Sequence, residues 1–570
     1  MATAVRMVEL RVLEGPNVYF PRPAVKLTVA VPGWLSAGEQ RAGALGKKLK
    51  VPGTIGPGAP GSEQRRRFVA RVAVHVLRQL ARTSRVGLAV RGRPGHEPDE
   101  VVVAYPWRRR DIAEALGEQA VELLGRLLNA RRPLRALFLE SAKRVRAVPP
   151  GPGPTLARPK IPVLAVTGTN GKTTTVRALA HILRSSGRRV AYTTTDGVYF
   201  QDQLIEEGDY SGPAGAATAL EQPDVDAVVL EVARGGILLK GIGTAHLDVA
   251  VVTNISADHL GLLGVFSLDQ LAEVKAAITR IVKPDGWTVL NADDPRVIGM
   301  GRGAKGRPFV FSLDPDHPAI RSALNEGGRA VAPLDRWLGL MRPRRPFQRL
   351  IALEEIPMTL AGISSLQTQN AMAAAAAALG AGLSPAEVVE GLRTFILDPE
   401  RNPGRANLFE LDGRTVIIDY AHNEAGMEGL VEICRGLRPQ GADAWLAYGT
   451  AGDRSDEVVH GMGYIAARGA EHVVVVELRR YLRGRDPQDL IERLRAGAVD
   501  GGAGPEDVPD FRTEMEGLQW MLERARPGDV VAVTALAQRP DIFAWLEERG
   551  ATLVGADRCR ELARRARGEV

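Results

Sequence analysis

The sequence predicts an α/β protein with a small α+β domain at its N-terminus and two larger domains whose sheets are covered by helices. The 570 residues, 45% of them hydrophobic and 25% charged, are typical of about three to four globular domains. Beyond residue 160, continuous β-branched runs alternate with helical patterns, which indicates buried parallel strands. Between these regions lies Pro149–Pro154, a Pro-Pro-Gly-Pro-Gly-Pro run typical of a linker.

The first region alternates strand and helix signals. Period-2 patterns predict strands at Val8–Val12 and Val25–Val31, before a Gly/Pro-rich loop at Val51–Gly61. The elements expected after this loop are an amphipathic helix at Arg67–Leu80, strands at Val86–Val90 and Val101–Ala104, and a helix at Asp111–Leu128. We therefore predict an α+β domain over residues 1–148 and a Pro/Gly linker over residues 149–160.

The second region predicts two α/β domains. In a middle domain over residues 161–402, the expected strands are Ile161–Thr167, Arg189–Thr193, Asp226–Glu231, Val249–Asn254 and Thr288–Asn291. Its helices include Lys172–Ser185 and the alanine-rich Ala371–Leu383, which is expected to pack inside the domain. A Rossmann-like domain is expected over residues 403–570, with strands at Thr415–Asp419, Ala444–Tyr448, His472–Val476 and Asp529–Thr534.

The charge is distributed unevenly along the chain. Residues 1–150 contain 27 Lys and Arg against 12 Asp and Glu, a balance of +15, whereas the remainder carries −8. Clustered positive charge favours an anionic partner or polymer, and an arginine-rich solvated surface is the alternative. Nucleic acid is disfavoured, because Arg65–Arg67 and Arg108–Arg110 lie in no recognisable nucleic-acid motif.

The amino-acid sequence shows neither a membrane-span signal nor a secretory signal. No apolar run reaches the ~18 residues of a membrane span, and the N-terminus lacks an apolar stretch with a small-residue cleavage site. Cys434 and Cys559 cannot form a disulfide framework, and no Cys-x-x-Cys pair is present. We expect a cytoplasmic protein with no membrane partner.

A glycine-rich loop follows the strand Ile161–Thr167 and opens a helix. Its glycines allow backbone amides to approach a phosphate, and the helix N-terminus adds a positive dipole end. Lys172 can reach the β- and γ-phosphates, and the Thr173 hydroxyl can bind Mg²⁺. The middle domain is therefore predicted to be a P-loop ATPase domain that binds ATP through Gly168, Thr169, Asn170, Gly171, Lys172, Thr173 and Thr174.

This loop resembles the ATP signature of the Mur ligase superfamily. Within it the chain is most similar to the cyanophycin synthetases, in the segments Leu13–Tyr19, Thr193–Tyr199, Asp209–Pro213, Leu230–Leu238 and Asn254–Gly261. Those enzymes carry an ATP-grasp ligase domain between their N-terminal and Mur-like parts, and here only the Pro/Gly linker stands there. The chain is therefore expected not to perform both of their ligations by itself.

The resemblance implies an ATP-dependent amide ligase. An acceptor carboxylate would be activated as an acyl phosphate and coupled to an amino acid or amine, and the acceptor would be peptide-like with an acidic main chain. A γ-glutamyl or folate-type ligase is an alternative, which Thr193–Tyr199 and Ala233–Ile237 disfavour. A non-catalytic nucleotide-binding scaffold that partners a separate ATP-grasp enzyme is another. A homo-oligomer is left open.

The resemblance also implies two Mg²⁺ sites and a set of catalytic residues. Lys172, Glu231, His259 and Lys275 match the catalytic positions, and Thr173, Glu231, His259 and a carbamylated Lys275 match the metal ligands. A buried carboxylate needs a partner, so a structural salt bridge is the alternative for Glu231. For Lys275 the alternative is a lysine on a helix surface.

The remaining predicted contacts to ATP come from the end of the middle domain and from the C-terminal domain. Asn370 matches an adenine-side asparagine, with a helix N-cap as the alternative. Arg405 would offer its guanidinium to the phosphates, and Asp419 would bind the ribose hydroxyls. His422 and Asn423 belong to the same motif as Asp419. For the substrates the implied residues are Thr195, Ser211, Arg234, Gly235, Asp453 and Arg454, although an ordinary βα loop remains the alternative for the last two.

Overall fold

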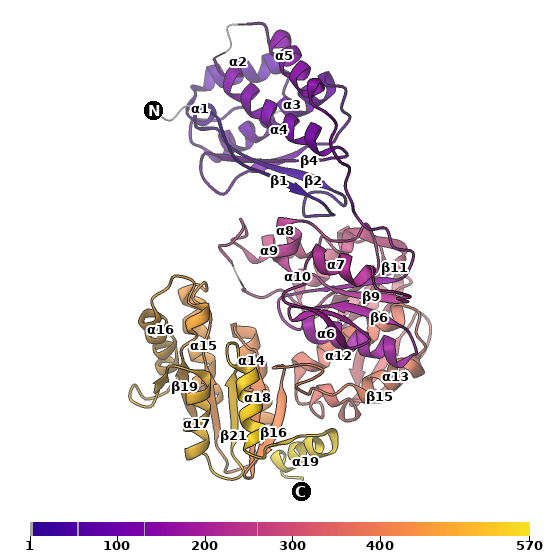
Figure 1. Ribbon diagram of the computed structural model, residues 1–570, viewed down its shortest axis with the longest axis vertical. Coiled ribbons are helices and arrows are strands. Elements are labelled where there is room, and N and C mark those ends of the chain that lie inside the picture. The colour runs from indigo at the N-terminus through magenta and orange to yellow at the C-terminus, as the bar shows by residue number, and fades with distance from the viewer. Residues whose placement is uncertain (1–3, 54–55, 130–131, 259, 570) are drawn as a thin grey trace. The chain divides into compact units, whose positions relative to one another are not determined.

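A computed structural model describes residues 4–53, 56–129, 132–258 and 260–569 (Figure 1). It divides into two compact units. The first contains the chain up to Arg158 together with Gly212–Ala217 and Arg234–Ala245, and the second contains the rest. The predicted α/β class is confirmed, because large sheets rich in parallel strands dominate the second unit. The predicted domain boundaries near residues 148, 160 and 402 stay predictions.

The first unit is an antiparallel sheet with helices on one face (Figure 1). In the described residues its strand order is β1-β2-β4-β3, with β1 Arg6–Leu13, β2 Ala24–Ala30, β3 Arg91–Pro94 and β4 Glu100–Pro106. The helices before the linker are α1 Pro32–Ser36, α2 Glu39–Leu49, α3 Glu63–Thr83, α4 Arg110–Leu127 and α5 Leu134–Ala147. Apolar side chains of β2, β4, α3 and α4 form the core, which explains the predicted alternation in this region.

One predicted strand is wrong. Val86–Val90 forms no strand, and the chain first joins the sheet at Arg91, opposite Ala104. The reason is the end of α3: Arg85 is left-handed with φ 62°, and the amide of Val86 donates to the carbonyl of Ala81. An amide used to cap a helix is not available to a sheet ladder.

Two short segments from the middle of the chain pack with the first unit. One of them contains α8, Arg234–Leu239. The amide of Ile242 donates to the carbonyl of Pro16 over 2.7 Å. Gly15 permits this approach, because a Cβ there would lie 1.8 Å from the carbonyl oxygen of Ile242.

The second unit begins with a mixed sheet of eleven strands within the described residues, in the order β15-β14-β13-β12-β11-β10-β5-β9-β6-β7-β8. Its centre, from β6 to β13, is parallel as predicted, whereas β7, β8, β14 and β15 are antiparallel additions at the two edges. The strands are β5 Val163–Thr167, β6 Val190–Thr193, β7 Gly197–Phe200, β8 Gln203–Glu207, β9 Ala227–Glu231, β10 Leu247–Val252, β11 Val282–Asn291, β12 Arg307–Phe311, β13 Arg329–Leu334, β14 Trp337–Met341 and β15 Gln348–Ala352.

The helices of this part are α6 Lys172–Ser185, α9 Leu268–Lys275, α10 Pro295–Gly299, α11 Pro318–Asn325, α12 Ser365–Gly380 and α13 Pro385–Thr394. Helix α7, Pro213–Leu220, is divided between the units: its residues up to Ala217 belong to the first. The alanine-rich α12 is buried as predicted: Ala371–Ala378 are fully inaccessible to solvent. Small side chains allow α12 to lie close to its neighbours, and it packs against α6, which follows the phosphate loop. The buried packing of α12 against α6 therefore supports the predicted nucleotide site.

The C-terminal part forms a second sheet, in the order β20-β19-β18-β21-β17-β16-β22 for the described residues. Its strands are β16 Asn407–Leu411, β17 Arg414–Asp419, β18 Ala444–Tyr448, β19 His472–Val476, β20 Asp510–Phe511, β21 Val530–Thr534 and β22 Thr552–Leu553. The helices are α14 Glu424–Leu437, α15 Asp456–Gly469, α16 Pro487–Asp500, α17 Glu514–Arg524, α18 Arg539–Glu548 and α19 Ala556–Ala566. Helices α14 to α16 cover one face, and α17 and α18 cover the other.

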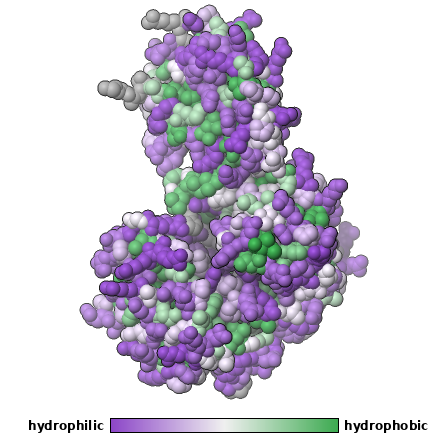
Figure 2. All heavy atoms as spheres, viewed as in Figure 1, coloured by the Kyte–Doolittle hydropathy of each residue, from purple (hydrophilic) through white to green (hydrophobic). Residues whose placement is uncertain are grey.

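The surface of the first unit is hydrophilic over most of the face seen in Figure 2. Several of its arginines are exposed, among them Arg67, Arg91, Arg93, Arg108 and Arg109. In the described residues, no helix is both long enough and apolar enough to cross a membrane.

Arg65 differs from these arginines, because it is fully buried. Its guanidinium donates to backbone carbonyls of Trp34 and Ala37, over 3.1 and 2.6 Å, and of Pro57 and Gly58, over 2.9 and 2.7 Å. One side chain thus holds the end of α1 against the Gly/Pro-rich loop.

We predict that Arg65→Met lowers the free energy of unfolding of this domain by about 3 kcal/mol, because buried carbonyls lose their donors. Hydrogen exchange of the full chain, followed by mass spectrometry, should accelerate around Trp34–Ala37. The control is Arg67→Met, which removes an exposed arginine from the same helix and should leave exchange unchanged. Equal protection in both variants would contradict the structural role of Arg65.

Candidate active site

The phosphate loop connects β5 to α6, as the sequence predicts. Gly168 and Gly171 both have positive φ, 154° and 81°. A Cβ at Gly168 would lie 1.8 Å from the Thr253 hydroxyl oxygen, and one at Gly171 would lie 2.0 Å from Oδ1 of Asn370. The loop therefore requires glycine at both positions, for backbone conformation and for space.

Residues at the end of β10 hold the loop in place. The amide of Thr169 donates to the carbonyl of Asn254 over 2.9 Å, and the amide of Asn170 donates to Oδ1 of Asn254 over 2.8 Å. Thr253 donates its hydroxyl to the carbonyl of Asn170 over 2.7 Å. Because these two loop amides are occupied, the amides left for an anion are those at the start of α6, which have no acceptor within the helix. Sequence reasoning missed Thr253, whose only signal is its place at the end of a strand.

Two lysines donate to carbonyls of the loop, one from the start of α6 and one from the end of α9. Nζ of Lys172 donates to the carbonyl of Thr169 over 2.9 Å, and Nζ of Lys275 donates to the carbonyl of Gly168 over 2.5 Å. Lys275 ends α9 and is only 4% exposed, so the alternative of a lysine on a helix surface is wrong. Its carbamylation stays a prediction.

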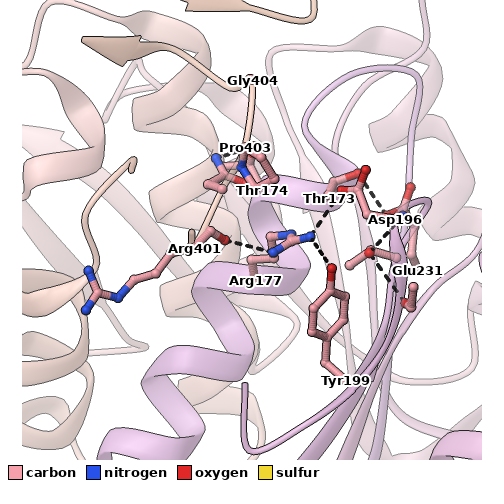
Figure 3. Close-up of polar contacts among 12 residues, drawn as sticks. Thr173, Thr174, Arg177, Asp196, Tyr199, Glu231, Arg401, Pro403 and Gly404 are labelled. Atoms are coloured by element: carbon pink, nitrogen blue, oxygen red, sulfur yellow. Dashed lines mark hydrogen bonds and ion pairs between the residues drawn. The ribbon is translucent and has the colours of Figure 1, made fainter. Parts of the chain in front are cut away.

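Glu231 and Thr173 form the polar centre of this region (Figure 3). Glu231 ends β9 and is 2% exposed, and its Oε2 accepts a hydrogen bond of 2.9 Å from the Thr173 hydroxyl. Its Oε1 is buried and has no partner among the described residues. Burial raises the pKa of Glu231, while the charge of Lys172 and the Thr173 hydroxyl act in the opposite direction. The structure shows no ion pair of Glu231 in its described part, which disfavours the structural salt bridge.

These donors fit Mg²⁺. An unpartnered carboxylate oxygen and a hydroxyl are hard oxygen ligands, and Mg²⁺ usually takes only one or two protein ligands besides phosphates and water. The described residues contain no group of three or more His, Cys, Asp or Glu side chains that could hold a metal without other ligands. His259, the predicted ligand of a second Mg²⁺, lies outside the described residues.

The side chain beside His259 is tied to the C-terminal domain. Asp258 accepts from Nη2 of Arg454 over 2.9 Å, and the Arg454 side chain is only 4% exposed. Asp453 accepts from Arg454 and from Arg483, over 3.2 and 3.0 Å. Asp453 and Arg454 therefore lie where the two domains meet, and their predicted contact with an amino acid stays a prediction.

Asn370 lies inside α12 and faces the start of α6. Its Oδ1 accepts from the Thr175 hydroxyl over 3.4 Å, and its Nδ2 donates to Gln367 over 3.1 Å. The N-cap of α12 is Ser364, so the alternative of an N-cap at Asn370 is wrong. The structure places this amide beside Gly171.

Arg405 and Asp419 lie close to each other at the start of the C-terminal domain. The guanidinium of Arg405 stacks on the ring of Tyr420 at 4.1 Å, and its Nη1 is buried without a partner in the described part of the chain. Asp419 accepts from the amides of Ala406 and Ala421, both over 2.8 Å. Burial raises the pKa of Asp419, and the positive charge of Arg405 opposes this shift.

The next two residues of the motif have different surroundings. His422 is buried, its Nδ1 donates to the carbonyl of Tyr420 over 2.9 Å, and burial lowers its pKa to about 4. The ring is therefore neutral near pH 7. Asn423 is the N-cap of α14, and its amide pairs with that of Asn170 through two hydrogen bonds of 3.1 Å. This pair joins the C-terminal motif to the phosphate loop.

The other predicted substrate residues lie on loops that hydrogen-bond to one another: the amide of Tyr210 donates to the carbonyl of Thr194 over 3.1 Å, and the amide of Ala233 donates to the carbonyl of Ser211 over 3.0 Å. Thr195 lies in the bend between β6 and β7. Ser211 is buried and donates its hydroxyl to Asp209 over 2.5 Å. Arg234 and Gly235 belong to the first unit, at the start of α8. Roles in substrate binding stay predictions for all four.

The chain matches two family models. The Mur ligase middle domain matches residues 166–378, and the Mur ligase, glutamate ligase domain matches residues 404–536. A cyanophycin synthetase of Crocosphaera subtropica is 37% identical over 383 residues, which are 66% of this chain and 42% of that protein. The chain thus spans less than half the length of this relative.

A second relative is matched over more of its length. The UDP-N-acetylmuramoyl-L-alanyl-D-glutamate–2,6-diaminopimelate ligase of Alkalilimnicola ehrlichii is 31% identical over 384 residues, 65% of this chain and 70% of that protein. Among solved structures, E. coli FolC in complex with DHPP and ADP shares the fold, with a TM-score of 0.50 and 21% identity over 68% of this chain and 89% of that one. With both family models placed on the domains that meet at the phosphate loop, the chain belongs to the Mur ligase family.

Proposed function

We propose that this protein is an ATP-dependent ligase that forms an amide bond between an acceptor carboxylate and an amino acid or amine. The observation that carries the proposal is the meeting of two domains at the phosphate loop, where Asn170 pairs with Asn423. A ligase must bring an amine to an activated acyl group, and a second domain beside the phosphate loop would allow this. Mur ligases are ATP-dependent enzymes that form amide bonds, which supports the same conclusion.

In the proposed reaction a carboxylate oxygen of the acceptor attacks the γ-phosphorus of ATP and ADP leaves. The amine nitrogen then attacks the acyl carbon, the C–O bond to phosphate breaks, and the nitrogen loses a proton. Lys172 and the first amides of α6 would offset the charge of the phosphates, and Arg405 would add a guanidinium from the C-terminal domain. These groups act best when they are held in place before the substrates bind, as the buried contacts of the loop suggest.

Two Mg²⁺ ions are part of the proposal. Thr173 and Glu231 would hold one, and His259 with Lys275 would contribute to the other. When bound, Mg²⁺ would neutralise negative charge on the transferring phosphoryl group. The residues that would hold ATP are Gly168, Thr169, Asn170, Gly171, Thr174, Asn370, Asp419, His422 and Asn423, besides Lys172, Thr173 and Arg405.

For the acceptor we propose a peptide-like molecule with an acidic main chain. The identity of 37% to a cyanophycin synthetase supports this class, and so does the +15 charge of the first 150 residues. A separate ATP-grasp enzyme would then supply the second ligation. The chain has no segment of that kind between its N-terminal domain and the phosphate loop, where residues 149–160 form the connection.

The experiment that tests the function measures ADP formation from ATP and Mg²⁺ with a panel of amino acids, each offered with short aspartate–arginine peptides or with folyl glutamates. We expect ADP only when an amino acid and a peptide are both present, and a product heavier by one residue in mass spectrometry. Product formed only on folyl glutamates would favour the folate-type ligase. ATP binding without turnover on any pair would favour the scaffold.

Lys172→Ala should reduce kcat/KM for ligation by about 100-fold or more, because the charge at the β- and γ-phosphates is lost. Steady-state ADP release is the measurement. Lys305→Ala is the matched control, because Lys305 is an exposed lysine that does not belong to the phosphate loop. This variant should keep normal turnover. Normal turnover in Lys172→Ala would refute its role.

Glu231→Gln keeps the shape of the side chain but removes the charge. We expect ligation to fall by about 100-fold and Mn²⁺ to bind more weakly in a titration, because a metal ligand is weakened. The unfolding temperature should stay the same or rise, since a buried charge without a counter-ion is replaced by a neutral amide. A purely structural role predicts the opposite pattern, with lower stability and unchanged metal affinity. Glu221→Gln, at an exposed position, is the control.

A further inference from the structure

One carboxylate in the second unit lies between arginines of two domains. Asp196 follows β6, and its Oδ2 accepts from Nη2 of Arg177 over 3.1 Å (Figure 3). Its Oδ1 accepts from Nη2 of Arg539 over 3.2 Å. Arg177 belongs to α6, and Arg539 is the first residue of α18 in the C-terminal domain. The side chain of Arg177 is 3% exposed, so solvent screens this ion pair little.

The same two arginines hold the connecting segment between the domains, residues 401–404. Nη1 of Arg177 donates to the carbonyl of Arg401 over 3.0 Å, and Nη1 of Arg539 donates to the carbonyl of Pro403 over 3.2 Å. Gly404 leaves room for this arrangement, because a Cβ there would lie 2.5 Å from Cδ of Arg539. The segment is thus held from the middle domain and from the C-terminal domain at once.

Helix α6 links these contacts to the phosphate loop. Arg177 comes four residues after Thr173, so both lie on the same face of the helix. In the first turn of α6, Thr174 accepts at its hydroxyl oxygen from Nδ2 of Asn402 over 3.3 Å. Arg177 also donates to the hydroxyl of Tyr199 over 3.1 Å. A helix that begins at the phosphates therefore contacts the connecting segment directly.

A buried carboxylate fixes the backbone that precedes Arg539. Glu514, 1% exposed, accepts from the amides of Leu536, Ala537 and Gln538, over 2.6, 3.0 and 2.6 Å. These are the three residues before α18. Fixing their backbone fixes the place from which the Arg539 side chain starts.

We propose that Arg177, Asp196 and Arg539 are positioning residues, here called the Asp196 clamp, which orient Arg405 toward the phosphates of bound ATP. The inference rests on the proposed function. Arg405 follows the connecting segment directly, and its Nη1 is buried without a hydrogen-bond partner in the part of the chain that the structure describes. Since the clamp holds the carbonyls of Arg401 and Pro403, it restricts the direction in which the Arg405 side chain leaves the backbone. None of the three clamp residues needs to touch ATP.

The first test is Arg539→Gln, which removes the charge from the clamp while Arg405 stays in place. We expect kcat to fall about 10- to 100-fold, as a misplaced reacting group does, with the KM for the amino acid nearly unchanged. Arg539→Lys keeps the positive charge beside Asp196 but lacks the two-pronged guanidinium that also reaches the carbonyl of Pro403. This variant should recover part of the loss. Arg549→Gln is the control, because Arg549 is exposed just after the same helix.

The decisive measurement combines Arg539→Gln with Arg405→Gln. If the clamp acts through Arg405, the double variant loses no more than Arg405→Gln alone, because the group to be positioned is already missing. Multiplied losses would show that Arg539 acts by another route and would overturn the proposal. Asp196→Asn, similar in size and shape, provides a second route to the same comparison and should give the same lack of additivity.

A readout without catalysis separates this inference from the proposed function. Isothermal titration with adenylyl imidodiphosphate and Mg²⁺ should show that Arg539→Gln and Arg405→Gln weaken binding by a similar factor, and that the double variant is no weaker. If the titration gives this result but the wild type catalyses no ligation, the clamp proposal stands and the proposed ligase function is refuted. Unchanged affinity in Arg539→Gln together with unchanged kcat would overturn the clamp and leave the ligase standing.

Discussion

The phosphate loop depends on two positions at which no side chain can be accommodated. At Gly168 the space is taken by the Thr253 hydroxyl, and at Gly171 by the amide of Asn370. These neighbours come from the end of β10 and from α12, so elements far apart in sequence shape the loop together. Because α12 is built from alanines, it can lie close enough to α6 for Asn370 to reach the loop. The geometry is therefore prepared before any anion binds, which is what electrostatic stabilisation of a phosphoryl group requires.

Two buried charged side chains outside this loop lack a full set of hydrogen bonds. Glu231 keeps one buried oxygen without a partner, and Arg405 keeps one buried nitrogen without a partner, within the residues that the structure describes. Leaving such groups unsatisfied is unfavourable, and the cost is tolerated in proteins mainly where a ligand completes the bonding. A cation would satisfy Glu231 and an anion would satisfy Arg405. A complex of a polyphosphate with a divalent metal supplies both charges, which unites the two observations in one ligand.

The first unit shows how a domain can be completed by residues from elsewhere in the chain. Gly212–Ala217 and Arg234–Ala245 pack with it, although the sequence pattern assigns them to the middle domain. The close backbone approach of Gly15 to Ile242 explains why the segment Leu13–Tyr19 carries a glycine at this position. Inside this unit the buried Arg65 side chain stabilises the structure through hydrogen bonds to backbone carbonyls. The exposed arginines carry the positive charge of the surface.

Local signals in the sequence determined the central strands, the start of α6 and the requirement for glycine in the loop. Helix Lys172–Ser185 and the strands Ala444–Tyr448 and His472–Val476 have the predicted bounds, because burial periodicity and the Gly-Lys-Thr step act over a few residues. The antiparallel edges of the large sheet were not predicted, nor was the helix cap that removes Val86–Val90 from a sheet. Only the tertiary structure decided the contacts of Glu231, the pairing of Asn170 with Asn423, and the placement of Asp196 between Arg177 and Arg539. Those contacts join residues up to 343 positions apart, and no local pattern encodes which distant partners the chain topology brings together.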